Sequence, residues 1–345
     1  MKRGNKVADQ VKERDRSNKQ TDDPKPTRVI STGSTLLDLA ISWESHRGGG
    51  IPPGIMVEIF GPSSAGKTTL LCEIAGGVQR AGGQALYLDP EGRLSAEYAS
   101  RLGFEIDLED DNQYKRPDTI PEAFEPIRTW EPEPEGAIHG IFADSLAALS
   151  TEMEMEASDK MGMRRAKEFS EQLRKSCRTI ANENYLLVCS NQIRQTLGGP
   201  FQEQYKSPGG ESIAFYSSLR LRVSKPTKIK KKKKIGSGVV EKVVATSILV
   251  TVYKSSVGEP FNSAPVYIDL NYGIDDIRAN LDYLKKIYDT KTYILGDDNL
   301  GKGIDAATAR LEENNWEKRL RNEVIRTWFQ VQDRFRVERK DKVRI

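Results

Sequence analysis

The chain has 345 residues, of which 37% are apolar and 30% are charged, and its net charge is +3. That small net charge means that any affinity for nucleic acid must come from local clusters of basic residues. No apolar run approaches the roughly 18 residues of a membrane span. The three cysteines show no CxxC spacing, and the charged N-terminal stretch lacks the apolar core of a secretion signal. We therefore expect a reduced, cytoplasmic protein.

Residues 1–28 are almost entirely polar, with nine Lys/Arg against five Asp/Glu. So few apolar side chains cannot bury a core, and we expect a flexible segment here. From residue 29 onward, short apolar runs alternate with amphipathic segments. We expect a large α/β domain at 29–272, a small C-terminal α/β domain at 273–333, and a basic tail at 334–345.

Several apolar runs read as strands that are separated by helical patterns. The expected strands are 55–60, 84–89, 137–145 and 185–192, and the expected helices are 67–82, 95–103 and 164–184. This alternation predicts a parallel sheet with helices on both faces. Three more runs follow without a long helix and predict antiparallel strands at the sheet edge: 212–225, 243–255 and 264–270. The predicted fold class is α/β, with a mixed, mainly parallel sheet.

The segment from Gly61 to Thr68 reads GPSSAGKT and fits the pattern G-x-x-x-x-G-K-[ST]. It lies between an expected strand and an expected helix, which is the context that this phosphate-binding motif requires. Gly61 and Gly66 permit a tight loop of inward-facing N–H groups, and the helix directs its positive end at the same place. We expect Lys67 to reach the β- and γ-phosphates and the Thr68 hydroxyl to ligate Mg²⁺.

Other polar side chains stand where expected strands end, at the same edge of the sheet as the motif. Asp144 ends the run IHGIFAD and would complete the Mg²⁺ site. Asp89 and Glu91 follow the strand ending in LYLD, and Glu91 is our candidate for activating water, although a surface carboxylate is the alternative. Gln192 ends a fourth strand, where its amide would bond the γ-phosphate in one nucleotide state only, or would simply occupy a turn.

These pieces, with the segments ISTGSTLLDLAI, YLDPEGRLSAEYASRLG, ADSLAAL, SNQIR and PGGESIAFYSSLRLRV, resemble the RecA-type recombinases in order and approximate spacing. The resemblance covers about residues 29–320 and is looser in the C-terminal part. It implies an ATPase that depends on DNA, uses ATP and Mg²⁺, and promotes strand exchange in recombination and repair. It also implies a helical filament on single-stranded DNA that takes up double-stranded DNA and holds ATP between adjacent subunits.

The resemblance also implies roles for particular residues. Those implied to bind the nucleotide are Gly61, Pro62, Ser63, Ser64, Ala65, Gly66, Lys67, Thr68, Thr69, Tyr98 and Asp144, with Thr68 and Asp144 on Mg²⁺. Tyr98 takes the position that stacks on adenine. Those implied in catalysis are Glu91, Lys67, Gln192 and Lys254. Lys254 matches one of two lysines that reach the ATP of the neighbouring subunit, and Ser256 stands where the other would be.

Two loops contact DNA in the family, and they match residues 152–165 and 194–210. The second is rich in Gly and Pro, which allow close approach to phosphates, and carries aromatic residues that can stack on bases. A mobile solvent loop and a solvated basic helix face are the alternatives. With the lysine run described next, the expected DNA contacts are Arg164, Arg165, Arg174, Arg194, Gln195, Thr196, Leu197, Gly198, Phe201, Lys206, Ser207, Gly209, Gly210, Lys230, Lys231 and Lys232.

Five consecutive lysines, from Lys230 to Lys234, lie between two expected strands. We expect them at the tip of a hairpin, where they would hold a second DNA strand by its phosphates, in agreement with the resemblance. A merely solubilising loop is the alternative.

Three features depart from the family pattern. The family's N-terminal helix, which docks on the neighbouring subunit, is not evident in residues 1–28, the tail is basic rather than acidic, and Ser256 replaces a lysine. These departures suggest a divergent member, encoded by a phage or a mobile element. A second hypothesis is a nucleotide-binding regulator or recombination mediator with the same fold and no strand exchange. A hexameric helicase is disfavoured because no accessory helicase domain is recognisable.

Overall fold

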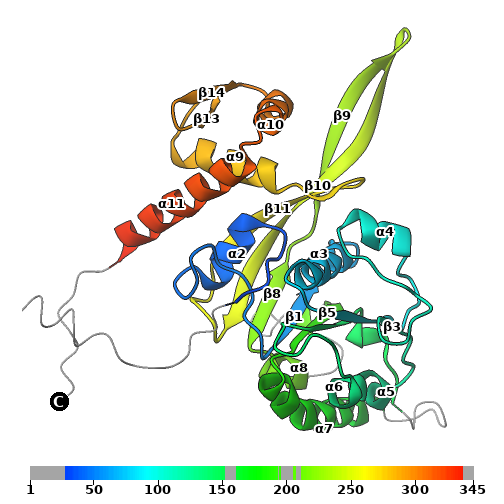
Figure 1. Cartoon of the computed structure of the whole chain (residues 1–345). Helices are drawn as coiled ribbons and strands as arrows, with labels where there is room; N and C mark the ends of the chain where they lie inside the picture. The colour runs from blue at the N-terminus through cyan, green and yellow to red at the C-terminus, as the bar shows by residue number, and fades with distance from the viewer. Residues whose placement is uncertain (1–27, 152–160, 193, 196–204, 207–210, 337–345) are drawn as a thin grey trace, which may run out of the picture.

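A computed structural model describes residues 28–151, 161–192, 194–195, 205–206 and 211–336 (Figure 1). Its main sheet has the strand order β12-β11-β10-β8-β1-β5-β4-β2-β3, with β9 paired to β10 off this path. The mutually parallel strands are β1 (Ile55–Gly61), β2 (Ala85–Leu88), β3 (Tyr114–Lys115), β4 (Gly140–Ala143), β5 (Leu186–Gln192) and β8 (Leu219–Val223). The antiparallel strands are β9 (Thr227–Ile235), β10 (Gly238–Ser255), β11 (Ser263–Asp269) and β12 (Gly273–Ile274). The predicted α/β fold with a mixed, mainly parallel sheet is confirmed.

Helices cover both faces of this sheet, as the alternation of strands and helices predicts. One face carries α2 (Thr35–Ser42), α3 (Lys67–Arg80) and α4 (Ala96–Arg101); the other carries α5 (Ile120–Phe124), α6 (Pro126–Thr129), α7 (Met161–Asn182) and α8 (Glu211–Tyr216). Successive residues of β1 enter opposite cores, because side chains alternate along a strand: Val57 joins the first apolar cluster and Met56 the second.

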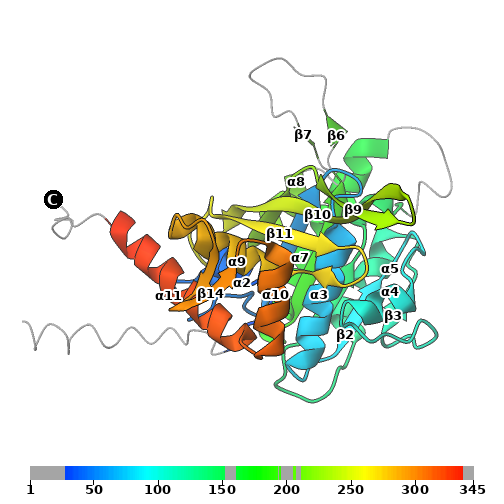
Figure 2. The ribbon, with the colours of Figure 1, turned by 90° about the horizontal axis from the view of Figure 1, so that it is seen from above.

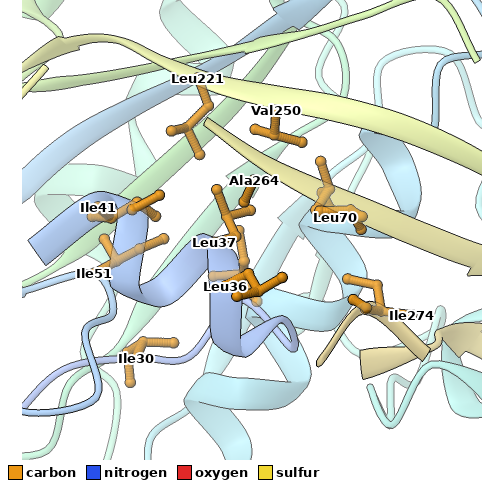
Figure 3. Close-up of a cluster of buried hydrophobic side chains, with 14 of the residues drawn as sticks. Ile30, Leu36, Leu37, Ile41, Ile51, Leu70, Leu221, Val250, Ala264 and Ile274 are labelled. Atoms are coloured by element: carbon orange, nitrogen blue, oxygen red, sulfur yellow. The ribbon is translucent and has the colours of Figure 1, made fainter. Parts of the chain in front are cut away.

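The helix α2 shows how such a face is stabilised. Ser34 caps its N-terminus, and the side chain accepts from the N–H of Leu37. Leu37 points towards Ala264 of the sheet (Figure 3), and Leu36, Leu37 and Ala264 are all fully buried. Each buried leucine contributes about 1.5–3 kcal/mol relative to an exposed one.

The C-terminal part packs against this core rather than standing apart from it. It consists of α9 (Asp276–Ile287), β13 (Tyr293–Leu295), β14 (Asp298–Gly301), α10 (Ile304–Glu313) and α11 (Glu317–Phe335). The Asp276 carboxylate accepts from the N–H and the hydroxyl of Thr35, both at 2.7 Å, at the start of α2. Trp43 and Phe329 meet edge to face at 5.4 Å. The sheet itself continues to Ile274 in β12, and the division at residue 272 stays a prediction.

Two expectations for residues 212–238 are wrong. The expected strand begins only at Leu219, because residues 211–216 form the helix α8, which places Ile213 in the second apolar cluster beside α7. The lysine run is not the tip of the hairpin but lies within β9, where Lys232 pairs with Glu241 of β10. The turn falls at Gly236, whose φ of +60° suits a tight hairpin turn. The hairpin of β9 and β10, called the arm below, projects from the sheet (Figure 1).

Candidate nucleotide-binding site

The glycine-rich loop joins the end of β1 to the start of α3. Gly66 precedes the helix with a φ of +82°, a left-handed conformation that favours glycine. A Cβ on Gly61 would lie 2.6 Å from the carbonyl oxygen of Val223. Since Gly66 has no side chain with which to cap α3, the first N–H groups of the helix are left for an anionic ligand.

A cavity of about 500 Å³ opens at this loop, within the range of about 300–1,000 Å³ that is typical of small-molecule sites. Residues 63–69 of the loop form one wall, and Glu91, Tyr98, Asp144 and Gln192 line it from three further segments. The structure therefore brings together most of the nucleotide-site residues that the sequence indicates. Ile268 of β11 also lines the cavity and approaches the loop closely at Gly66.

Lys67 is the buried cation of this cavity, with 8% of its surface exposed. Its Nζ donates to the carbonyl oxygens of Pro62 at 2.8 Å and Gly61 at 3.3 Å. Burial lowers the pKa of Lys67, while the charges of Asp144 and Glu91 act in the opposite direction. The ammonium is thus held by weak neutral partners that a phosphate oxygen would replace favourably.

Asp144, which directly follows β4, accepts hydrogen bonds from three hydroxyl groups around the loop. Its Oδ2 accepts from Thr68 Oγ1 at 2.6 Å and from Tyr87 OH at 3.1 Å, and its Oδ1 accepts from Ser190 Oγ. Burial and then the charge of Asp144 raise the pKa of Tyr87, which stays a neutral donor. Carboxylate and hydroxyl oxygens in this arrangement suit Mg²⁺, which prefers hard oxygen ligands.

The two carboxylates after β2 differ in their surroundings. Asp89 is 2% exposed and accepts from the N–H of Leu94 at 2.8 Å and from Tyr114 OH at 3.0 Å, so it orders the loop. Glu91 accepts from Ser145 Oγ at 3.2 Å and pairs with the exposed guanidinium of Arg93 at 2.8 Å. Glu91 is therefore the better placed of the two to act on a water molecule in the cavity.

Two further predicted residues reach the cavity from other elements. Tyr98 of α4 shares a hydrogen bond of 2.8 Å with the hydroxyl of Thr69. Gln192 is the last residue of β5 and lies beside Gly61 in the parallel register. Lys254 does not line this cavity. Its Nζ donates to the carbonyl oxygens of Ala214 and Phe215 at 2.9 Å, near the C-terminal end of α8.

The predicted DNA contacts that the structure describes are dispersed. Arg165 of α7 donates to the carbonyl oxygens of Leu146 and Ala147 in the 3₁₀ turn η1 (Leu146–Ala148), whereas Arg174 is exposed. The lysine run forms ion pairs within the chain: Lys230 and Lys232 with Glu241 at 2.6 and 3.5 Å, and Lys231 with Asp305 at 2.8 Å. Because side chains alternate along β9, the run is divided between two faces of the arm.

For the remaining predicted DNA contacts the structure gives backbone placement or nothing. Arg164 lies in α7, and Arg194 and Gln195 form β6 (Arg194–Gln195), which pairs with β7 (Tyr205–Lys206) at the top of the view in Figure 2. The other predicted contacts lie outside the described residues: Thr196, Leu197, Gly198, Phe201, Ser207, Gly209 and Gly210. Over the part of the chain that the structure does describe, no helix is both long and apolar enough to cross a membrane.

A glycine-rich loop between a strand and a helix, facing an aspartate at the end of a neighbouring strand, defines a P-loop nucleotide-binding protein. The RecA N-terminal domain family matches residues 17–275. The protein RecA of Borreliella burgdorferi is 33% identical over 323 residues, covering 89% of this chain and 83% of its own. The protein RecA of Halalkalibacterium halodurans is 34% identical over 294 residues, which cover 83% of this chain and 78% of that protein. The chain belongs to the RecA family of recombinases.

Proposed function

We propose that this chain is a DNA-dependent ATPase that assembles on single-stranded DNA and promotes homologous pairing and strand exchange with double-stranded DNA. The observation that carries the proposal is the single cavity at which the glycine-rich loop, the Thr68–Asp144 pair, Glu91 and Gln192 meet. Gln192 also ends β5 just before residues 194–210, which match a DNA-binding loop of the family. A change at the nucleotide would therefore reach the DNA contact through one residue.

ATP fits this cavity through contacts that the chain already prepares. The N–H groups at the start of α3 would hold the phosphates, and Lys67 would exchange its two carbonyl partners for phosphate oxygens. Thr68 and Asp144 would hold Mg²⁺, which when bound neutralises charge on the phosphates. The ring of Tyr98 would lie against the adenine. Catalysis of this kind is mainly positioning and charge stabilisation.

Hydrolysis and sensing would use the residues at the far side of the phosphates. Glu91, held by Ser145 Oγ, would orient a water molecule and accept its proton. The Gln192 amide would bond the γ-phosphate and lose that bond after hydrolysis. Lys254, which lies away from the cavity of its own chain, would serve the ATP of a neighbouring subunit in a filament.

Two substitutions in the cavity test this proposal. Lys67→Ala removes the phosphate cation, so ATP-dependent binding of a fluorescent single-stranded oligonucleotide should be lost. Glu91→Gln keeps the nucleotide contacts, so DNA binding with ATP should persist while phosphate release falls by about 100-fold or more. Lys318→Ala, at an exposed lysine of α11, is the matched control. Retention of ATP-dependent DNA binding by Lys67→Ala would contradict the proposal.

One observation favours the alternative, a RecA-fold regulator or recombination mediator without strand exchange. Ser256 stands where a second lysine would serve the neighbouring ATP, and its Oγ donates locally to the Ser218 carbonyl oxygen at 3.3 Å. A side chain this short cannot replace a lysine across an interface. If Ser256→Lys raises DNA-dependent hydrolysis while the unaltered chain promotes no strand exchange, the regulator is the better description.

A further inference from the structure

A largely buried ion pair lies beside the nucleotide site without lining its cavity. Glu58 of β1 is fully buried, and its Oε2 accepts from Arg220 Nε of β8 at 2.6 Å. Its Oε1 accepts from Asn191 Nδ2 of β5 at 3.0 Å. A buried carboxylate costs several kcal/mol unless it is paired and hydrogen-bonded, so Glu58 fixes the positions of both partners. Packing alone does not explain a charged residue at position 58, because an apolar side chain would fill the same space.

The two partners of Glu58 stand on either side of residues 193–210. Asn191 directly precedes Gln192, the last residue of β5. Arg220 follows α8, which begins directly after residue 210. The strand β1 pairs in parallel with both β5 and β8, and Glu58 lies opposite Arg220 in that register. One carboxylate therefore binds both the residue that precedes Gln192 and the strand that follows α8.

Arg220 also connects this carboxylate to Lys254. The Arg220 guanidinium lies 4.5 Å from the ring centroid of Phe60 and 5.4 Å from that of Tyr253, which hold it in place. A bulge in β10 before Lys254 brings that lysine opposite Arg220, on the side of α8. Burial and then the charge of Arg220 lower the pKa of Lys254. The negative charge of Glu58 thus offsets the two neighbouring positive charges, those of Arg220 and Lys254.

We propose that the buried Glu58–Arg220 ion pair is a positioning element that ties Gln192 at the nucleotide cavity to α8 and Lys254, across both ends of residues 193–210. The inference rests on the proposed function. An ion pair with additional hydrogen bonds has a narrow geometry, so a movement of Gln192 on ATP binding is transmitted to the DNA-binding segment instead of being absorbed between β5 and β8. Neither Glu58 nor Arg220 lines the nucleotide cavity, so both are positioning residues.

The test uses the double variant Glu58→Gln with Arg220→Gln, because removing both charges of a buried pair is far better tolerated than removing one. The measured quantity is the ratio of single-stranded DNA dissociation constants in ADP and in a non-hydrolysable ATP analogue. The double variant should unfold cooperatively and bind a fluorescent ATP analogue within about threefold of the unaltered chain, while this ratio falls by about tenfold or more. An unchanged ratio in the folded double variant would overturn the inference.

Two additional proteins make the outcome unambiguous. Asn191→Ala removes a single hydrogen-bond donor to Glu58 and leaves the ion pair, so it decides the question if the double variant does not fold; the same ratio should fall, and an unchanged ratio refutes the inference. Asp298→Asn with Arg319→Gln removes an ion pair of 2.7 Å in the C-terminal part and should leave the ratio unchanged. An unaltered chain whose DNA binding ignores ATP would instead refute the proposed function.

Discussion

Replacing Gly66 by alanine tests the geometry of the phosphate loop directly. Gly66 has a φ of +82°, and an added Cβ would lie 2.5 Å from Cδ1 of Ile268. An L-residue in the left-handed region costs about 1–2 kcal/mol, and displacing a buried side chain from its rotamer costs about 0.5–1.5 kcal/mol more. We therefore expect Gly66→Ala to lower the free energy of unfolding by about 1.5–3.5 kcal/mol, as measured by urea denaturation, and to weaken ATP binding.

A matched glycine separates the two contributions. Gly82 has a φ of +86°, and a Cβ there would meet no heavy atom within 4 Å among the described residues. Gly82→Ala should therefore cost only the backbone contribution, about 1–2 kcal/mol. In the Ile268→Val background, which lacks Cδ1, Gly66→Ala should cost no more than Gly82→Ala does. Equal losses for the two glycine variants in the unaltered background would refute the close approach of Ile268 to the loop.

Three further predictions concern His139, the lysine run and Tyr98. Burial lowers the pKa of His139 from 6.5, so the unfolded chain binds a proton that the folded chain excludes; stability should fall as the pH drops below about 6.5. In urea titrations, the free energy of unfolding of His139→Gln should fall less with decreasing pH than that of the control His46→Gln. Equal falls in the two variants would exclude protonation of His139 as the cause. In the described part of the chain Lys233 forms no ion pair, whereas Lys230 is paired at 2.6 Å; Lys233→Ala should therefore reduce the salt dependence of double-stranded DNA binding by about one phosphate contact, and more than Lys230→Ala. If the two substitutions had equal effects, the lysines would be better explained as charges that protect an exposed strand edge from pairing with other chains. Tyr98→Ala should weaken ATP binding by about tenfold if its ring stacks on adenine, whereas Tyr98→Phe should change it little; similar losses would place the contribution in the hydroxyl.

The edge of the sheet at which the site lies follows from the sequence, because the carboxyl ends of parallel strands share one edge. Glu91, Asp144 and Gln192 each follow or end such a strand, and the structure places all of them at the cavity. Two of the three hydrogen-bond partners of Asp144, Tyr87 and Ser190, were not predictable in this way. Ser190 lies beside Asp144 only because β4 and β5 pair with Ala143 opposite Cys189, and a single sequence does not specify that register.

The misplaced lysine run has a similar cause. A row of lysines has little intrinsic preference for a strand, and its own sequence suggests an exposed turn. Pairing with the partner strand, together with the positive φ of Gly236, moves the turn past Ile235. The Glu58–Arg220 pair was equally hidden, since the run IMVEIF indicates a buried strand and nothing about the side chain that neutralises Glu58.

The central claim is that ATP drives assembly of this chain on single-stranded DNA. Electron microscopy of the unaltered chain with single-stranded DNA and a non-hydrolysable ATP analogue tests it most directly. The account predicts helical filaments with the analogue and their loss with ADP or in Lys67→Ala. Rings or dispersed monomers with the analogue, or filaments that form equally well with ADP, would contradict it.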